Sequence, residues 1–200
     1  MIAIINYGLG NLHSVQKAAV YVGGTAVVTD DAQVILGADK VILPGVGAFA
    51  DGMKGLESRG LAQVVREAVE SGKPLLGICL GMQLLFEQSE EQGQHLGLGL
   101  LSGKVVLFQQ PSVKVPQIGW NQVEICKPSG LLKGIQDGDY LYFNHGYYCI
   151  PEDARDVLTM TDFGVRFASS VERELIFGVQ FHPEKSQNTG LQILKNFVEL

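Results

Sequence analysis

Short apolar runs alternate with amphipathic segments along residues 2–78, and this alternation is the strongest constraint on the fold. The apolar runs at 2–6, 25–29, 41–43 and 75–78 have the length and composition of buried strands. Helical spacing of apolar residues marks the segments at 12–22 and 56–70. Because strands that alternate with helices pair in parallel, the sequence predicts an α/β fold with a mostly parallel central sheet flanked by helices.

The second half of the chain is expected to be rich in strands. Apolar runs separated by glycine and proline predict strands at 105–109, 122–127, 140–144, 166–170 and 175–181. Helical patterns occupy 82–88 and the end of the chain, where a final helix starts near Ser186. No repeat, linker or low-complexity tract interrupts the sequence, so we expect one α/β domain over residues 1–200 with a β-rich second half.

Composition argues against several classes of protein. The 15 Lys and Arg against 21 Asp and Glu leave a net charge of −6, which disfavours binding to nucleic acid through its phosphates. No apolar stretch approaches the ~20 residues of a membrane-spanning helix, and residues 1–11 do not resemble a signal peptide. The 3 cysteines are widely spaced and odd in number, which suits a reducing compartment. We therefore expect a cytoplasmic protein that binds neither membrane nor nucleic acid.

The segment Gly77-Ile-Cys-Leu-Gly81 carries the strongest local signal. Glycines on both sides of a nucleophile permit a sharp turn from strand to helix, which exposes the central side chain above the sheet. At the start of the helix the dipole favours the thiolate form of Cys79, and the backbone N–H of Leu80 is placed to stabilise an oxyanion. The alternative is a buried cysteine in a glycine-rich turn. Cys126 and Cys149 lie in strand-like segments and are assigned to packing.

A cysteine nucleophile needs a base nearby, and His182 is the best placed of the 4 histidines. It directly follows the predicted strand at 175–181 and is followed by Pro183 and Glu184. The proline is rigid, so the two side chains that flank it can point the same way, and the carboxylate can orient the imidazole. The sequence thus predicts a triad in which Cys79 is the nucleophile, His182 the base and Glu184 the residue that orients it.

With these residues together, the chain resembles the class I, or triad, glutamine amidotransferases over essentially its whole length. Two motifs are typical of the whole family, Gly77-Ile-Cys-Leu-Gly-Met-Gln83 and Phe181-His-Pro-Glu184. Three others are similar to one branch, the glutaminase subunits of imidazole glycerol phosphate synthase: Asn6-Tyr-Gly-Leu-Gly-Asn11, Pro44-Gly-Val-Gly-Ala-Phe49 and Val115-Pro-Gln-Ile-Gly-Trp-Asn121. The resemblance implies the amidotransferase fold and hydrolysis of L-glutamine to glutamate and ammonia, with no metal and no other cofactor.

The resemblance also implies roles for residues outside the triad. The backbone at Val46 and Gly47 is expected to turn and offer an N–H to the oxyanion beside that of Leu80. Substrate-binding positions of the family match Gln83, Glu91, Gly146 and Tyr147, with Glu91 facing the α-ammonium group of glutamine. Asn144 and Gly146 depart from the usual Tyr-Phe-Val-His-Ser-Tyr-Tyr pattern, and Gln117 stands where histidine is frequent. We expect main-chain rather than side-chain contacts with the substrate at Gly146.

A partner subunit is implied as well, because free ammonia at neutral pH is mostly protonated and unreactive. In the family a (β/α)8-barrel cyclase docks over the glutaminase site, forms a heterodimer and uses the ammonia in histidine biosynthesis. Interface-facing positions match five residues of this chain: Trp120, Asn121, Tyr142, His145 and Lys185. Trp and Tyr are frequent anchors of protein interfaces.

Other functions remain open from the sequence. A paralogous subunit that supplies ammonia to another acceptor, such as a surface sugar, would share all of these motifs. Subunits that serve anthranilate, a pyridoxal precursor or GMP usually carry a different loop at 44–49. A partner-independent cysteine hydrolase and an inactive binding module are two further alternatives, and the intact Cys79, His182 and Glu184 disfavour the second.

Overall fold

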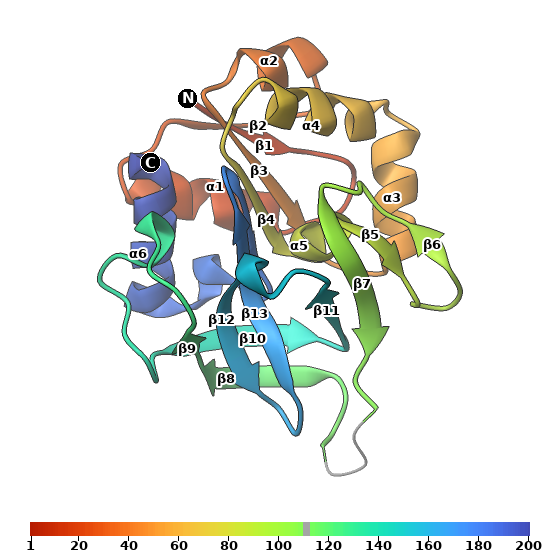
Figure 1. Ribbon diagram of the computed structural model, residues 1–200. Coiled ribbons are helices and arrows are strands. Elements are labelled where there is room, and N and C mark those ends of the chain that lie inside the picture. Colours follow the sequence, from red (N-terminus) through yellow and green to blue (C-terminus); the bar gives the residue numbers. More distant parts are fainter. Residues whose placement is uncertain (110–112) are drawn as a thin grey trace.

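An eight-stranded mixed sheet organises the chain, with the strand order β2-β1-β3-β4-β14-β13-β12-β9 (Figure 1). The computed structural model describes residues 1–109 and 113–200. The strands from β2 to β14 in this order run parallel, and those from β14 to β9 pair antiparallel. The strands of this sheet are β1 (Ile2–Ile5), β2 (Ala26–Thr29), β3 (Lys40–Gly45), β4 (Leu75–Cys79), β9 (Glu124–Ile125), β12 (Val157–Asp162), β13 (Arg166–Arg173) and β14 (Ile176–Val179).

Two smaller sheets complete the β structure of the second half. A four-stranded sheet has the order β11-β7-β5-β6, and an antiparallel ribbon joins β10 to β8. In Figure 1 this ribbon crosses the lower end of the β12–β13 hairpin. The strands are β5 (Phe86–Ser89), β6 (His95–Leu96), β7 (Leu101–Leu107), β8 (Gln117–Gln122), β10 (Tyr140–His145) and β11 (Tyr147–Pro151).

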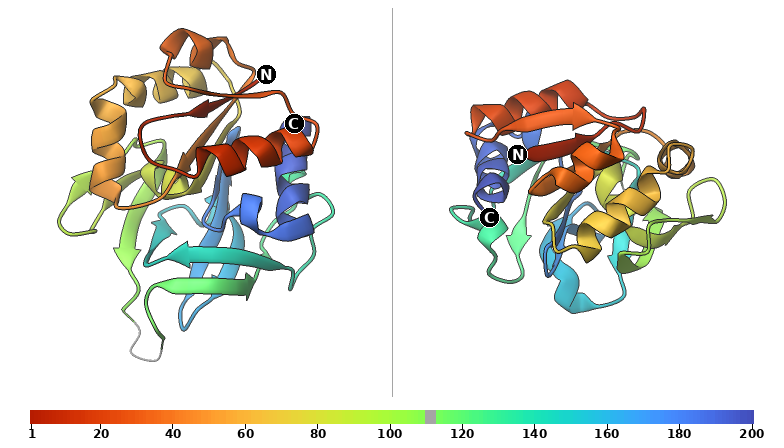
Figure 2. Two further views of the ribbon diagram at one scale, coloured as in Figure 1. Left: turned by 180° about the vertical axis from the view of Figure 1, so that it is seen from behind. Right: turned by 90° about the horizontal axis from the view of Figure 1, so that it is seen from above.

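Helices cover both faces of the large sheet, as the two views of Figure 2 show. Alternate side chains of a strand point to opposite faces, and in β1 Ala3 and Ile5 join one core while Ile2 and Ile4 join the other. The first core includes apolar residues of α2, α3 and α4, and the second includes those of α1 and α6. The helices are α1 (Leu12–Tyr21), α2 (Ala32–Gly37), α3 (Phe49–Glu57), α4 (Leu61–Glu70), α5 (Leu80–Leu84) and α6 (Gln187–Glu199). Within the described ranges, none of them has the length and apolar character needed to cross a bilayer.

The α/β class and the parallel arrangement of β1 to β4 confirm the prediction from the sequence. The strand predicted at 122–127 is wrong in its bounds, because pairing with β10 starts the strand at Gln117 and β9 holds only two residues. Strands β5, β6, β11 and β12 and helices α2 and α3 were not predicted. The strands among them are short or lie beside turns, where apolar periodicity is weak.

Two predicted helices differ from the structure. The helix predicted at 56–70 starts too early: Leu56 and Glu57 are the end of α3, and α4 begins only at Leu61, after the chain turns at Gly60, whose φ of +70° is left-handed. The helix predicted at 82–88 stops at Leu84, and the chain continues as β5, which pairs with β7. Leu85 and Phe86 are apolar because both are fully buried where the chain enters β5, and not because they lie on one face of a helix.

The tightest packing in the fold lies at the turn between β4 and α5. A Cβ atom on Gly81 would overlap the backbone carbonyl of Leu43 in β3, and one on Gly77 would lie 2.7 Å from the carbonyl oxygen of Gly81. Backbone atoms on neighbouring elements cannot move aside without disrupting the sheet. Both glycines are therefore required for the turn to lie this close to β3.

Replacement of Gly81 with alanine should destabilise the fold by about 3 kcal/mol or more, because the new methyl group meets backbone rather than a flexible side chain. Gly37→Ala is the matched control, since a Cβ there meets nothing within 4 Å. Chemical denaturation of the two variants checks this expectation. Equal stabilities of Gly81→Ala and Gly37→Ala would contradict it.

Candidate active site

The candidate site forms where three neighbouring strands end. Strand β4 lies between β3 and β14, and Cys79 at its last position pairs in register with Gly45. His182 follows β14 after Gln180 and Phe181. Carboxyl ends of parallel strands meet at one edge of a sheet, so residues far apart in the sequence are brought together there.

Cys79 occupies a strained turn, as the elbow interpretation predicts. Its φ of +55° and ψ of −111° lie in a region that side-chain-bearing residues rarely adopt. The thiol is 5% exposed, and Leu80 begins α5 directly after it. The unpaired N–H groups of a first helical turn are available to a ligand, and that of Leu80 lies next to the sulfur.

His182 and Glu184 form a buried pair beside Cys79. The Nδ1 atom of His182 lies 3.0 Å from Oε1 of Glu184, and the side chains are 2% and 1% exposed. The backbone of His182 is fixed as well, because its N–H donates to the carbonyl of Tyr142 at 2.9 Å and its carbonyl accepts from the Ser186 hydroxyl at 2.6 Å. The pair is thus held in one orientation.

The surroundings of His182 raise its pKa. Burial by itself would lower the pKa, but hydrogen bonds to Cys79 and Glu184 and the negative charge of both groups outweigh it and raise the pKa to about 9. At neutral pH His182 therefore carries a proton, and an imidazolium next to a cysteine favours the thiolate. This arrangement supplies an activated nucleophile together with a proton donor for a leaving group.

A cavity of about 190 Å³ opens above the thiol. All of the predicted oxyanion and substrate-binding residues line it: Val46, Gly47, Leu80, Gln83, Glu91, Gly146 and Tyr147. Gly47 has a φ of +104°, which a residue with a side chain would adopt only under strain. The size and mixed lining suit a small polar molecule such as one amino acid.

Glu91, which was expected to face the α-ammonium group of a substrate, brings a carboxylate to the cavity. Its Oε2 atom accepts the backbone N–H of Phe49 at 2.8 Å, at the start of α3. Burial and the charge of Glu91 raise the pKa of Tyr147, which lines the same cavity. A carboxylate held in this way can pair with a ligand ammonium group.

Three of the predicted interface residues gather on the surface near His182. The Trp120 and Tyr142 rings pack edge to face with centroids 6.0 Å apart, and the Lys185 ammonium lies 5.9 Å from the centre of the Tyr142 ring. Trp120 is 44% exposed. We call Trp120, Tyr142 and Lys185 the aromatic cluster.

His145, which was expected to face a partner, is buried in this chain. Its side chain is 6% exposed and packs among the rings of Phe108, Phe143 and Phe167. Burial lowers its pKa to about 4, although the carbonyl of Tyr147 opposes this effect. His145 is thus neutral at pH 7, and its Nδ1–H donates to that carbonyl at 2.7 Å. His145 therefore lines the same cavity as a buried neutral side chain rather than as an exposed one.

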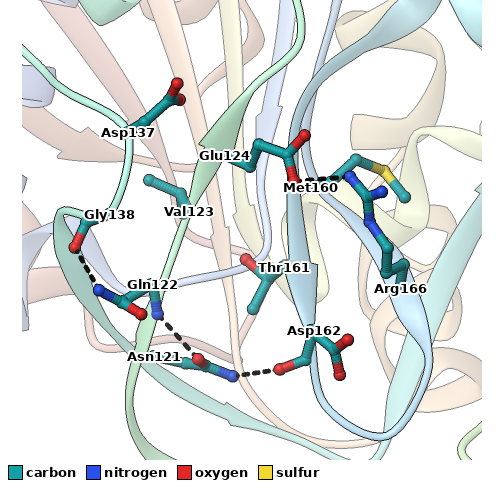
Figure 3. A pocket seen from close by; sticks show the side chains of 10 residues that line it. All are labelled: Asn121, Gln122, Val123, Glu124, Asp137, Gly138, Met160, Thr161, Asp162 and Arg166. Atoms are coloured by element: carbon teal, nitrogen blue, oxygen red, sulfur yellow. Dashed lines mark hydrogen bonds and ion pairs between the residues drawn. The ribbon is translucent and has the colours of Figure 1, made fainter.

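Asn121 also lies apart from the aromatic cluster. Adjacent residues of β8 point to opposite faces, and the amide of Asn121 donates to the carbonyl of Asp162 at 2.8 Å. Figure 3 shows it at the rim of a separate, more open cavity of about 550 Å³ between β8 and the β12–β13 hairpin. Cys79, His182 and Glu184 do not line that cavity. In the described part of the chain, no group of three or more His, Cys, Asp or Glu side chains could hold a metal ion.

Sequence reasoning missed two buried residues beside Cys79. Gln180 is fully buried, and its amide nitrogen lies 3.7 Å from the Cys79 sulfur. Tyr7 is 1% exposed, its hydroxyl lies against Gly45, and burial followed by the charge of Cys79 raises its pKa. The signal for Gln180 was a polar residue inside an otherwise apolar strand end, two positions before the predicted base. Tyr7 gave no such signal, because tyrosine is common in apolar segments.

Comparisons with known proteins show the family of the chain and its fold. The family model for glutamine amidotransferase class-I matches residues 3–200. The imidazole glycerol phosphate synthase subunit HisH of Aquifex aeolicus is 53% identical over 97% of this chain and 94% of its own length. That of Moorella thermoacetica is 54% identical over 100% of this chain and 94% of its own. The solved structure of PurLQS from Thermotoga maritima shares the fold, with a TM-score of 0.76 and 20% identity over 99% of this chain and 97% of its own.

The raised pKa of His182 predicts a pH-dependent contribution to stability. A pKa near 9 in the folded chain, against about 6.5 when unfolded, means that protonation stabilises the fold. This contribution is fully present below about pH 6.5 and is lost as pH rises through about 9. Glu184→Gln removes a group that raises the pKa, so its deficit in unfolding free energy should be largest at low pH and shrink toward pH 9.

Denaturation curves between pH 6 and pH 9.5 measure this deficit. Glu124→Gln is the control, because Glu124 pairs with Arg166 on the surface, where ion pairs contribute little. A deficit for Glu184→Gln that stays constant or grows with pH would show that His182 is not protonated in the folded protein.

Proposed function

This chain belongs to the class I glutamine amidotransferase family, and on that premise we propose that it is the glutamine-hydrolysing subunit of an imidazole glycerol phosphate synthase. It hydrolyses L-glutamine to glutamate and supplies the ammonia to histidine biosynthesis. The observation that carries the assignment of chemistry is the buried Cys79, His182 and Glu184 constellation at the base of a cavity sized for one amino acid. The specific synthase follows from relatives at about half identity over the whole chain.

In the first half of the reaction the sulfur of Cys79 attacks the side-chain amide carbon of glutamine. The carbonyl oxygen becomes an oxyanion, which the backbone N–H of Leu80 and one from the Val46–Gly47 peptide stabilise. His182 gives its proton to the amide nitrogen, the carbon–nitrogen bond breaks and ammonia leaves. The product is a γ-glutamyl thioester on Cys79, and His182 is left neutral with Glu184 still on its Nδ1 atom.

In the second half, neutral His182 takes a proton from a water molecule that attacks the thioester. The carbon–sulfur bond breaks, glutamate leaves, and Cys79 with protonated His182 is restored. Glu91 pairs with the α-ammonium group of the substrate, while Gln83 and the backbone at Gly146 and Tyr147 complete the binding site. One water is consumed and one ammonia is released in each cycle.

The ammonia acceptor belongs to a second subunit, which is a (β/α)8-barrel cyclase in this proposal. The aromatic cluster of Trp120, Tyr142 and Lys185 supports docking close to the site, because the Tyr142 ring lies 6.5 Å from the His182 ring and carries exposed Trp120 and Lys185 beside it. Val46 is 40% exposed and lines the cavity above Cys79, so a partner that covers this cavity can contact the oxyanion site directly. Transfer at the interface would spare the ammonia from protonation in water.

Glutamine hydrolysis should be slow for this chain alone and rise by about 10²-fold or more when the barrel cyclase and its nucleotide substrate are added. An increase of this size in the rate of hydrolysis is the effect expected from one additional oxyanion donor. Release of glutamate, measured with and without the partner, checks this. Cys79→Ala should remove the activity under both conditions. Full hydrolysis by Cys79→Ala would contradict the proposed nucleophile, and fast turnover without any partner would favour an independent hydrolase.

Trp120→Ala should reduce the stimulation by the partner while leaving the basal hydrolysis near that of the unaltered chain. Tyr21→Ala is its control, because Tyr21 is an exposed aromatic residue (79%) outside the aromatic cluster. It ends α1, which leads into β2, an edge strand of the large sheet. Restoration of growth without histidine in a strain that lacks the glutaminase subunit separates the proposed acceptor from that of a paralogous pathway.

A further inference from the structure

Gln180 connects the nucleophile to the wall of the substrate cavity through its side-chain amide. Its Nε2 atom lies 3.7 Å from the Cys79 sulfur, within hydrogen-bonding distance for sulfur, and its Oε1 atom lies 3.1 Å from Nε2 of Gln83. Gln83 in turn donates to the carbonyl oxygen of Tyr147 at 3.0 Å. Gln180 is fully buried and Gln83 is 5% exposed, so this chain of hydrogen bonds is shielded from water.

The orientation of both amides follows from the hydrogen-bonding capacity of each atom. The carbonyl of Tyr147 can only accept, so the atom of Gln83 facing it must be the NH₂ group. That nitrogen has two protons, and the second one requires an acceptor, which is Oε1 of Gln180. The NH₂ group of Gln180 is then the atom that faces the sulfur. The backbone carbonyl of Tyr147, acting through Gln83, thus determines that the NH₂ group of Gln180 is the one that faces Cys79.

We propose that Gln180 is a catalytic residue of the glutaminase reaction, which donates a hydrogen bond to the Cys79 sulfur and so stabilises it while it carries negative charge. This role rests on the proposed function, because it concerns the same nucleophile. A neutral N–H donor favours the charged form of its acceptor, and the effect is large where water is excluded. The sulfur carries that charge before it attacks the amide carbon and again as it leaves the thioester.

The same amide sets the polarity of the cavity wall. Both N–H groups of Gln83 are engaged by Tyr147 and Gln180, so the oxygen is the atom of that side chain left to contact a ligand. Gln83 lines the cavity, and its oxygen can accept only from an N–H donor of the substrate. Gln180 therefore acts at two places, on the sulfur directly and on the substrate by holding Gln83.

The test compares Gln180→Met, which keeps a long unbranched side chain but removes both hydrogen bonds, with the unaltered chain. Alkylation of Cys79 by iodoacetamide is measured across pH without glutamine or partner. Mass spectrometry of the peptide that contains Cys79 separates its alkylation from that of the exposed Cys126. The alkylation profile of Gln180→Met should move to higher pH, and kcat of partner-stimulated hydrolysis should fall about 10- to 100-fold, the effect of one lost hydrogen bond to a charged atom.

Asn196→Leu controls for the loss of a buried amide far from the site. Asn196 is 4% exposed and donates to two backbone carbonyls, those of Leu131 and Lys133, at 2.8 Å each. It should lower the melting temperature without moving the alkylation profile. If Gln180→Met is too unstable for kinetics, alkylation at low temperature of the fraction that remains folded still gives its profile.

An unchanged alkylation profile in folded Gln180→Met would overturn the role of Gln180, whatever happens to kcat. That outcome is distinct from failure of the proposed function, which full glutamine hydrolysis by Cys79→Ala would reveal. A shift of equal size in Asn196→Leu would also overturn the proposal, because it would attribute the effect to general loosening of the fold.

Discussion

The close approach of the β4–α5 turn to strand β3 is the constraint on which the site depends. Gly81 lies against the carbonyl of Leu43, and Gly77 lies against the turn itself, so a side chain at either position would separate the elements. This close approach accompanies the strained conformation of Cys79, whose backbone pairs with Gly45 on one side and whose strand pairs with β14 on the other. The strain at Cys79, on the order of 1–3 kcal/mol, is maintained by the sheet on both sides.

The charge interactions around Cys79 take place among buried side chains. His182 and Glu184 are almost inaccessible to water, and the charges of Glu184 and Cys79 raise the pKa of His182 despite that burial. Gln180 adds an uncharged donor on another side of the sulfur, and its partner Gln83 continues into the cavity wall. The Cys79 sulfur therefore lies among His182, Gln180 and the carbonyl oxygen of Asn144, which is 3.8 Å away, while the cavity side stays open to a small substrate.

The parts of the site that could be predicted from the sequence are those with a strong local motif. The glycine-flanked cysteine and the His-Pro-Glu segment each follow a predicted strand, which made His182 the best candidate for the base of Cys79, and the structure brings both to one edge of the sheet. The contacts of Gln180 and His145 depend on packing between distant parts of the chain, so the polar residue at 180 gave a weak signal and no partner. His145 was assigned to an interface from its match to family positions, but Phe108, which follows β7, and Phe167 of β13 pack against its ring and bury it. The division of the 56–70 segment at Gly60 was likewise hidden, because glycine within a helical pattern is tolerated.

The central claim is that Cys79 becomes covalently attached to the γ-glutamyl group during turnover. The most direct test is to quench the glutamine-hydrolysing complex rapidly in acid and to examine the peptide that contains Cys79 by mass spectrometry. The account predicts a γ-glutamyl adduct on Cys79 that disappears when glutamine is exhausted and is absent from His182→Ala. Continuous turnover with Cys79 unmodified at every quench time, together with full activity of Cys79→Ala, would contradict it.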